Sequence, residues 1–387
     1  MKKLILMASM VAMFLSCKDQ NLYTESAPLA SSESIMGTVL PGKYIVVLKV
    51  VPELKGMPKA VREKVLALLI KNGADQAAID YIYSAALQGF AGTLNPSQLK
   101  SLLNDPNVAY IEADQIVSIN QKKSSGGGST QPAQEIPWGI TRVGGSSDGT
   151  GKTAWIIDTG IDLTHPDLNL DATRGFSAFS RGKDAGFNDG NGHGTHVAGT
   201  VAAKNNTIGV VGVAANANVI PIKVLGSTGS GTNSGVIAGV DWVAVKGKLG
   251  EVANMSLGGG VSAALDQAVL NAANVSGVKF ALAAGNASTN ANNSSPARVN
   301  GINIFTVSAH DINNNFASFS NYGNPPVDFC APGVTIKSTW IGGRYNTISG
   351  TSMATPHVCG LLLLGNVNSG GTVNNDPDGN PDILARK

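Results

Sequence analysis

The chain has 387 residues, 43% of them hydrophobic, which is enough to form one large folded domain and a smaller one. Only 14% of the residues are charged, well below the roughly 25% of an average soluble protein, and the net charge is +2. Because no cluster of lysine and arginine stands out along the sequence, the composition argues against a protein that binds nucleic acid.

Residues 1–16 are predicted to be a signal peptide for export. Two lysines precede an apolar run at residues 4–15, which is too short to cross a bilayer as a helix, since crossing takes about 20 residues. The run ends in a segment that resembles the bacterial lipobox, so Cys17 is predicted to be lipidated, with an ordinary cleaved signal peptide as the alternative. Residues 17–41, rich in serine, alanine and threonine, would tether an exported lipoprotein to the outer membrane or the cell surface.

Residues 42–120 are predicted to form a small α+β domain. Strand patterns stand at YIVVLKV, IDYIYSAA, LQGFAGTL and VAYIEADQIVSI. One helix is expected from Pro58 to Asn72, and a second starts at Asn95-Pro96, where a capping residue precedes a proline. The order strand, helix, strand, strand, helix, strand predicts a ferredoxin-like domain. Taken alone, such a domain could be any small binding module.

A larger domain is predicted from residue 133 to residue 387, after a flexible Gly/Ser-rich linker at residues 121–132. Its apolar segments TAWIID, VIPIKVL, VANMSL, KFALAA and INIFTVSA alternate with helical stretches. This alternation is typical of an α/β fold with a doubly wound, mostly parallel sheet.

Three short segments contain residues suited to hydrolytic chemistry. Asp158 ends the apolar run of WIIDTGID, His193 lies in GHGTHVAGT, and Ser352 lies in SGTSMATPH at the predicted start of a helix. Each residue also has a simpler interpretation, as a turn-capping carboxylate, a surface histidine or a helix-capping serine. His193 and His196 could be half of a metal site, but the segment lacks the glutamate of zinc protease motifs, so no catalytic metal is predicted.

In the order Asp, His, Ser, these three segments together resemble the signature segments of subtilisin-like serine proteases. The resemblance implies that Ser352 is the nucleophile, His193 the general base and Asp158 the residue that orients the base. Asn286, in the segment AAGN, would donate a hydrogen bond to the oxyanion together with the Ser352 backbone N–H. His196 would have a structural role.

The resemblance also implies how substrates bind. An extended peptide would lie between two glycine-rich segments by backbone hydrogen bonds, and a pocket with small, uncharged walls would give broad specificity with a preference for apolar side chains. The substrate-binding residues implied are Gly229, Ser230, Gly231, Ser256, Leu257, Gly258, Ala283, Ala284 and Gly285.

Ahead of such a domain, the small domain resembles the inhibitory propeptide of the family. Its tail, Val117–Asn120, would lie across the pockets for the acyl side of the substrate, and self-cleavage is expected near Asn120. The mature enzyme would begin near Ala133, and it would either stay with the membrane or be released as a soluble protein.

A structural calcium site is a further implication of the resemblance. The Asn-rich loop at residues 204–210 resembles the tight calcium loop of the family, and calcium prefers six to eight oxygen ligands. The alternative is an ordinary solvated loop. The ligands implied are the carbonyl groups of Lys204, Ile208 and Val210 and the side chains of Asn206, Asp167 and Gln134.

Two features depart from the family pattern. Cys330 and Cys359 lie in segments that the resemblance brings close together beneath Ser352, and they are expected either to form a disulfide or to remain two buried free thiols. After Gly360 the helical pattern breaks within about ten residues, so the last helix is expected to be short or absent.

The sequence therefore predicts a subtilisin-like endopeptidase that is made as a zymogen. A second hypothesis is a surface-binding lipoprotein that kept the fold without the activity. A third is an esterase, but esterases of the α/β-hydrolase type place the serine before the aspartate and the histidine, within G-x-S-x-G. The order here is Asp, His, Ser, and Ser352 lies in GTSM, so the esterase is disfavoured.

Overall fold

In the computed structural model, residues 36–54, 57–119 and 131–387 are described, and they belong to one compact unit. The predicted signal peptide, the lipidated Cys17, most of the tether, the cleavage site at Asn120 and most of the linker lie outside the described residues. None of the helices within the described ranges is both long and apolar enough to cross a membrane.

The small domain has the predicted order of strands and helices. Its sheet has the order β4-β1-β3-β2, with antiparallel pairing of neighbouring strands. Asn95 caps α3 by accepting from the Gln98 N–H, and the Gln98 side chain accepts from the Asn95 N–H in return. The elements are β1 (Val39–Leu48), α2 (Pro58–Lys71), β2 (Ile79–Tyr83), β3 (Gly89–Thr93), α3 (Pro96–Leu103) and β4 (Val108–Ser118), with short 3₁₀ turns at Pro52–Leu54 and Gln76–Ala78.

The folded part of the small domain begins before the predicted boundary at residue 42. Strand β1 starts at Val39, and the Gly37 N–H donates to the Ile116 carbonyl oxygen at 2.8 Å. The pairing of β1 with β4 shifts register between Val39 and Tyr44, where Pro41 and Gly42 interrupt the strand pattern. The described structure of the small domain therefore begins before residue 42, with β1 and the contact of Gly37.

The large sheet confirms the predicted α/β fold. Its strand order is β18-β19-β15-β14-β13-β12-β6-β10-β7, and the pairs from β15 across to β7 are parallel. Its strands are β6 (Thr153–Asp158), β7 (Asn169–Leu170), β10 (Asn218–Lys223), β12 (Val252–Met255), β13 (Lys279–Ala283), β14 (Ile304–His310), β15 (Val327–Pro332), β18 (Asn368–Thr372) and β19 (Ile383–Arg386). The remaining strands are β5 (Ser147–Asp148), β8 (Phe176–Ser177), which pairs with β10, β9 (Ala214–Ala215), β11 (Ser230–Thr232), β16 (Ile336–Trp340) and β17 (Arg344–Ile348).

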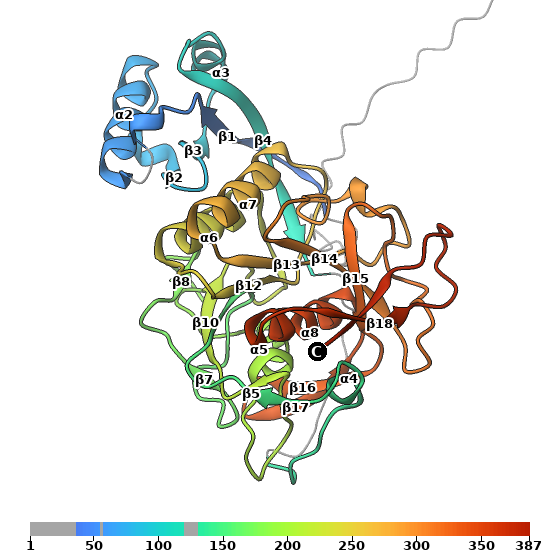
Figure 1. The fold of residues 1–387 in the computed structure, drawn as a ribbon. Helices are drawn as coiled ribbons and strands as arrows, with labels where there is room; N and C mark the ends of the chain where they lie inside the picture. The colour runs from blue at the N-terminus through green and yellow to red at the C-terminus, as the bar shows by residue number, and fades with distance from the viewer. Residues whose placement is uncertain (1–35, 55–56, 120–130) are drawn as a thin grey trace, which may run out of the picture. The chain divides into compact units, whose positions relative to one another are not determined.

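Helices cover both faces of the large sheet (Figure 1). Alternate residues of β6 supply the two cores, because successive side chains of a strand point to opposite faces. Trp155 and Ile157 pack on the side of α6 and α7, while Ala154 and Ile156 pack on the side of α5 and α8. The helices are α4 (Trp138–Arg142), α5 (His193–Ala202), α6 (Asn233–Lys246), α7 (Ala263–Ser276) and α8 (Thr351–Leu364), with a 3₁₀ turn at Ala291–Asn293.

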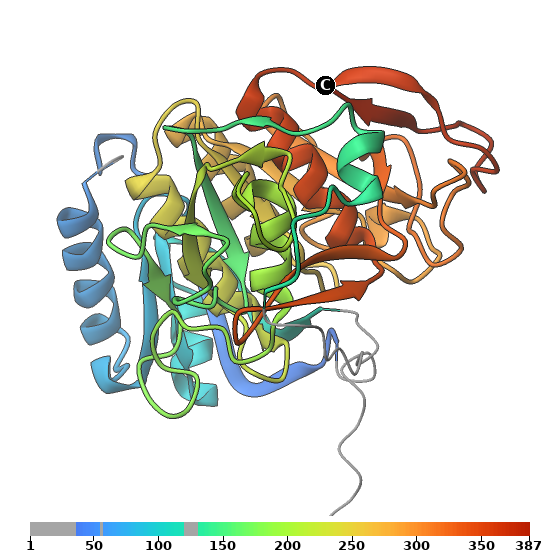
Figure 2. The ribbon, with the colours of Figure 1, turned by 90° about the horizontal axis from the view of Figure 1, so that it is seen from below.

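The C-terminal segment forms strands after α8. Helix α8 ends at Leu364, and within the described part of the chain no helix follows it, in line with the expected break. Strands β18 and β19 pair as an antiparallel hairpin, and β19 runs parallel to β15 at the edge of the large sheet (Figure 2). Val373 and Leu384 of this segment pack against Cys330. The tail thus extends the sheet, which its glycine- and asparagine-rich sequence did not indicate.

Cys330 and Cys359 are both free and buried. Cys330 lies on β15 beneath the C-terminal hairpin, whereas Cys359 lies on α8 in the core shared with α5. The disulfide is therefore wrong, because the two side chains belong to different clusters, and the alternative of two buried thiols holds. Burial raises the pKa of both thiols above the usual range, so both stay protonated at neutral pH.

Candidate active site

Three separate elements bring the predicted catalytic residues to the carboxyl edge of the large sheet. Asp158 is the last residue of β6, His193 is the first residue of α5, and Ser352 is the second residue of α8. All three are buried, with exposed fractions of 0%, 0% and 3%. Ligands bind at this edge in open α/β sheets, so the position suits a catalytic site.

His193 is held by the Asp158 carboxylate. Its Nδ1 atom lies 2.7 Å from Asp158 Oδ1 and 2.9 Å from Asp158 Oδ2, and the Thr159 N–H donates to the same carboxylate at 2.7 Å. This arrangement places the proton of a neutral imidazole on Nδ1. The Nε2 atom is buried and has no hydrogen-bond partner within the described structure, so it can accept a proton.

Ser352 makes its contacts with β12 and the residues that follow it. Its Oγ atom donates to the Ser256 carbonyl oxygen at 3.2 Å, and Ser256 Oγ donates to the Ser352 carbonyl oxygen at 2.8 Å. Asn254 Nδ2 donates to Ser256 Oγ at 2.8 Å. The side chain of Ser256 thus binds the first turn of α8 at Ser352, and its predicted part in substrate binding stays a prediction.

A buried carboxylate that the sequence analysis missed organises the start of α5. Asp189 accepts from the backbone N–H groups of Asn191, Gly192 and Thr195 at 2.8–3.0 Å and from the Thr195 hydroxyl at 2.7 Å. It also accepts from Thr159 Oγ1 at 2.9 Å, beside Asp158. The Asp189 side chain therefore links the segment that contains Asp158 to the segment that contains His193. Its only signal in the sequence is an aspartate in the glycine-rich stretch ahead of His193.

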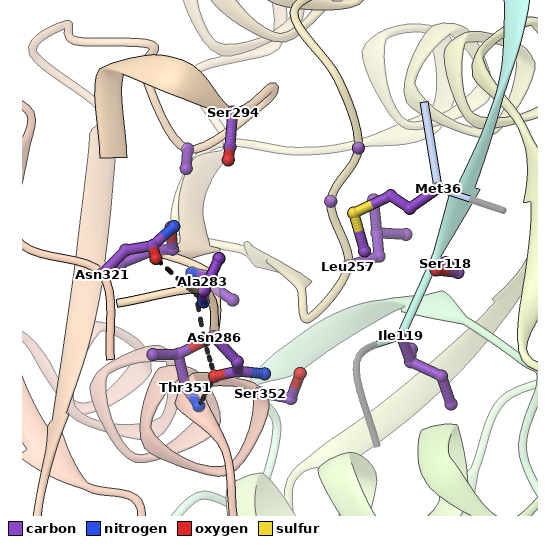
Figure 3. Close-up of a pocket in the computed structure, with 16 residues that line it drawn as sticks. Met36, Ser118, Ile119, Leu257, Ala283, Asn286, Ser294, Asn321, Thr351 and Ser352 are labelled. Atoms are coloured by element: carbon purple, nitrogen blue, oxygen red, sulfur yellow. Dashed lines mark hydrogen bonds between the residues drawn. The ribbon is translucent and has the colours of Figure 1, made fainter. Parts of the chain in front are cut away.

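Asn286 is oriented by the first residue of α8. Its side-chain oxygen accepts from the Thr351 N–H at 2.8 Å and from the Thr351 hydroxyl at 2.9 Å (Figure 3). Because the oxygen is used in this way, the amide nitrogen faces the other side. A β-carbon added at Gly350 would lie 3.4 Å from Asn286 Nδ2 and 3.7 Å from Ser352 N, so both N–H groups flank the same space.

A pocket opens beside Ser352 and Asn286 (Figure 3). Most of the predicted pocket residues line it, and their side chains are small or absent except for Leu257. Ser294, Ala297 and Asn321 also line it and were not predicted. The predicted substrate-binding residues in the lining are Leu257, Gly258, Ala283, Ala284 and Gly285, and the predicted catalytic residues Asn286 and Ser352 line it as well.

The tail of the small domain lies in the groove next to this pocket. Ser118 and Val117 of β4 pair antiparallel with Ser230 and Gly231 of β11, and the Ile119 N–H donates to the Gly229 carbonyl oxygen at 3.0 Å. On the other edge, Ser118 and Gly258 exchange backbone hydrogen bonds of 3.1 and 3.3 Å. The predicted glycine-rich segments therefore hold an extended peptide on both sides, as in β-augmentation.

Carboxylates hold the small domain against one helix of the large domain, α6. Asp114 accepts from the N–H and hydroxyl of Ser234 in the first turn of α6, at 3.1 and 2.5 Å. In the other direction, Asp241 of α6 accepts from the N–H groups of Ala85 and Ala86 at 2.8 and 2.7 Å. Burial raises the pKa of both carboxyls, while these hydrogen bonds lower it. Neither contact could be predicted from sequence patterns, because both join segments far apart in the chain.

The predicted calcium loop brings several oxygens around one point. Gln134 Nε2 lies 2.9 Å from the Lys204 carbonyl oxygen and 3.5 Å from both Asn206 Oδ1 and the Val210 carbonyl oxygen. Asp167 joins the same loop, because it accepts from Asn206 Nδ2 at 2.8 Å. Three acceptor oxygens thus surround a single amide nitrogen.

Asp167 is the one predicted calcium ligand with a carboxylate. Burial raises its pKa to about 6, although the Val210 N–H and the Tyr345 hydroxyl donate to it, both at 3.2 Å. The sixth predicted ligand residue, Ile208, donates its N–H to Asn206 Oδ1 at 2.8 Å. Among the described residues, no three acidic, histidine or cysteine side chains gather as a metal site, so a cation here would depend on carbonyl and amide oxygens.

Comparison with known proteins matches two segments of the chain to two families. Residues 149–369 match the subtilase family, and residues 43–120 match the peptidase inhibitor I9 family. The chain is 44% identical to alkaline serine exoprotease A of Vibrio alginolyticus over 76% of this chain, and it spans 54% of the length of that protein. It is 40% identical to an extracellular serine proteinase of a Thermus strain, over 88% of this chain and 83% of the relative. A crystal structure of a cold-adapted subtilisin-like serine proteinase is 42% identical, with a TM-score of 0.57, over 64% of this chain and 96% of that one.

Proposed function

The chain belongs to the subtilase family, and on that premise we propose that it is a serine endopeptidase made as an inactive precursor, with Asp158, His193 and Ser352 as its triad. The hydrogen bonding of His193 carries the proposal. A carboxylate occupies Nδ1, and Nε2 is buried without a partner within the described structure. A histidine held in this way is suited to take a proton from a hydroxyl group.

Peptide hydrolysis would proceed through an acyl-enzyme. Ser352 Oγ, which donates to the Ser256 carbonyl oxygen here, turns toward His193 Nε2, loses its proton to it and attacks the carbonyl carbon of the substrate. Asp158 stabilises the imidazolium that forms, and this imidazolium protonates the leaving amine. Water then attacks the acyl-enzyme with His193 as the base again, and Ser352 is regenerated.

Asn286 Nδ2 and the Ser352 backbone N–H would stabilise the negative oxygen of the tetrahedral intermediate. Two fixed donors at a water-poor site stabilise this charge more in the transition state than in the bound substrate. The Thr351 hydrogen bonds to the Asn286 oxygen support this role, because they turn the amide nitrogen away from α8. The small side chains of the pocket support broad cleavage after apolar or aromatic residues.

The small domain would act as the intramolecular inhibitor. Its tail pairs with the segments that would bind a substrate peptide, so substrate is excluded until the domain leaves. Cleavage near Asn120 would separate it and leave a catalytic domain that begins near Ala133. The name of the extracellular Thermus relative supports export, and lipidation at Cys17 with attachment to a membrane is part of the same proposal.

A test of the function uses the purified protein with casein and with a serine-directed phosphonate. We expect casein to be cleaved and one serine, Ser352, to carry the label. A folded protein that neither cleaves casein nor takes up the label would favour the non-catalytic surface-binding protein. Cleavage of ester substrates without cleavage of casein would favour the esterase.

We also propose a structural calcium ion at Asp167 and the loop at residues 204–210. The donor set fits, because three oxygens converge on the Gln134 side chain, and a flip of that amide would turn its own oxygen toward them. Lys204, Asn206, Ile208 and Val210 would complete the ligands together with Asp167 and Gln134. Gln134 lies close to the expected new N-terminus, so the ion would fix that end to the body of the enzyme.

Removal of calcium is expected to destabilise the mature protein. An ion present at 100 times its dissociation constant stabilises the native state by about 2.7 kcal/mol, so excess EDTA should lower the melting temperature by about 5–10 °C and speed autolysis. Differential scanning calorimetry measures the first effect, and gel electrophoresis over time measures the second. Asp167→Asn is the matched control, since it should melt lower without EDTA and respond less to it. Unchanged melting and autolysis in EDTA, with no metal found by elemental analysis, would rule out the site.

A further inference from the structure

We propose that Asn321 is a positioning residue that holds the loop carrying Asn286 in its catalytic conformation. The inference rests on the proposed function, in which Asn286 is the oxyanion donor. Asn321 lies in the segment between β14 and β15, and its exposed fraction is 1%. Figure 3 shows it on the wall of the same pocket as Asn286 and Ser352.

Hydrogen bonds from Asn321 bracket Asn286 on both sides. Before Asn286 in the chain, the Asn321 N–H donates to the Gly285 carbonyl oxygen at 2.9 Å, and Asn321 Nδ2 donates to the Ala284 carbonyl oxygen at 2.8 Å. After Asn286, the N–H groups of Ala287 and Thr289 donate to Asn321 Oδ1 at 3.0 and 3.1 Å. One residue thus fixes the backbone on either side of the oxyanion donor.

The loop needs such support because its backbone is strained. Gly285 and Ser288 both have positive φ angles, +105° and +53°, which a side-chain-bearing residue such as Ser288 seldom adopts. The two residues lie on either side of Asn286, in a segment that belongs to neither a helix nor a strand. Such conformations persist where the surroundings hold them, and the hydrogen bonds of Asn321 provide that restraint.

Asn321 and Thr351 both hold the loop that carries Asn286, and they do so at different atoms. Thr351 fixes the carboxamide group and accepts from the Gly285 N–H at 3.1 Å, whereas Asn321 binds the backbone on both sides of Asn286. The packing is close as well, because a β-carbon at Gly285 would lie 2.4 Å from Asn321 Nδ2. A catalytic donor must be held within about 0.5 Å of its productive position. Loss of the Asn321 contacts should therefore lower kcat, because the donor acts mainly in the transition state.

Two other roles for Asn321 give different kinetics. A residue that only shapes the pocket would change KM and the preference among substrate side chains. A residue that only stabilises the fold would lower the melting temperature and leave kcat of the folded enzyme unchanged. A positioning role through Asn286 has a signature of its own, since the effect of Asn321 must vanish when Asn286 is absent.

The experiment is a double-mutant cycle on the mature enzyme with a peptide substrate. Asn321→Leu, which is similar in size but makes none of these hydrogen bonds, should lower kcat between about 10-fold and 100-fold with KM nearly unchanged. In an Asn286→Ala background the same change should lower kcat less than about twofold. The matched control is Asn292→Ala, because Asn292 Nδ2 donates to the Pro325 carbonyl oxygen at 3.1 Å and joins the same two segments farther from the site. Its kcat should stay at the wild-type value.

Asn321→Asp provides a second variant in case Asn321→Leu does not fold. It keeps an acceptor for Ala287 and Thr289 but places a carboxylate oxygen against the Ala284 carbonyl oxygen in place of the donor, so kcat should fall, and it should fall further when Asn286 is present than in the Asn286→Ala background. Suppose that Asn286→Ala alone lowers kcat. The positioning role would then be overturned if the change at Asn321 lowered kcat equally in both backgrounds, or if it changed only KM. If Asn286→Ala alone leaves kcat unchanged, the oxyanion assignment in the proposed function fails, and this inference falls with it.

Discussion

Ser352→Ala is expected to abolish peptide hydrolysis and to leave the precursor uncut. Without the hydroxyl, no acyl-enzyme forms and His193 has no proton to take. In subtilisin, a member of the same family, loss of the equivalent serine lowers kcat about 2 × 10⁶-fold, and a loss of similar size is expected here. The uncut chain should keep the tail of the small domain paired with β11. Mass spectrometry of the purified protein and cleavage of a fluorogenic peptide measure the two effects.

Ser349→Ala is the matched control for this variant. Ser349 lies three residues earlier on an exposed turn, and its hydroxyl accepts from the Thr335 N–H at 2.8 Å. It should mature and cleave peptides at close to the wild-type rate. A Ser352→Ala protein that still matures in a preparation free of other proteases would contradict self-processing. Full activity of Ser352→Ala would contradict the triad.

The fold was predictable because its signals are local. Strand and helix patterns repeat over short windows, and the cap at Asn95 is made by a neighbouring residue. The segments around Asp158, His193 and Ser352 place each residue at the end or start of an element. The fold therefore brings all three to one sheet edge, and Asp158 and His193 make direct contact.

The features that were missed depend on contacts between distant segments. Asp241 and Asn321 are ordinary polar residues in the sequence, and only the tertiary structure brings backbone N–H groups from distant segments to them. Asp189 binds N–H groups of its own turn, and its distant partner is the Thr159 hydroxyl. The disulfide, one of the two alternatives expected for Cys330 and Cys359, is not formed for a related reason. A family resemblance placed Cys330 and Cys359 near one another, but it could not show that the C-terminal hairpin covers one of them and α5 packs near the other.

The C-terminal hairpin shows most clearly which secondary structure cannot be predicted from sequence patterns. Residues 365–387 have few apolar side chains, so their sequence resembles a loop. In the structure, the Val373 and Leu384 side chains pack beneath the hairpin, and the buried Asp382 carboxyl accepts from the Ser308 hydroxyl on β14. Burial raises the pKa of Asp382 to about 7. A strand that joins the edge of an existing sheet needs little apolar sequence of its own, because the sheet provides its hydrogen-bond partners.

Asn286→Ala is expected to lower kcat about 100-fold to 1,000-fold with little change in KM. This is the loss known for removal of the equivalent donor in subtilisin, and the reason is that the donor meets a negative charge only after the substrate has reacted. Steady-state kinetics with a peptide substrate on the mature enzyme measure both constants. A rise in KM with kcat unchanged would assign Asn286 to substrate binding instead.

A second variant, Asn286→Asp, distinguishes the effect of Asn286 on kcat from its effect on the stability of α8. The alanine variant leaves the Thr351 N–H and hydroxyl without the acceptor that they have in the wild-type protein, so the start of α8 should be destabilised by about 1 kcal/mol. The aspartate variant keeps an oxygen for Thr351 and lacks the N–H donor. We therefore expect kcat to fall at least as far in Asn286→Asp as in Asn286→Ala, while the melting temperature falls less. If the loss of kcat followed the melting temperature across the two variants, it would reflect disorder at α8 and not a missing hydrogen bond to the oxyanion.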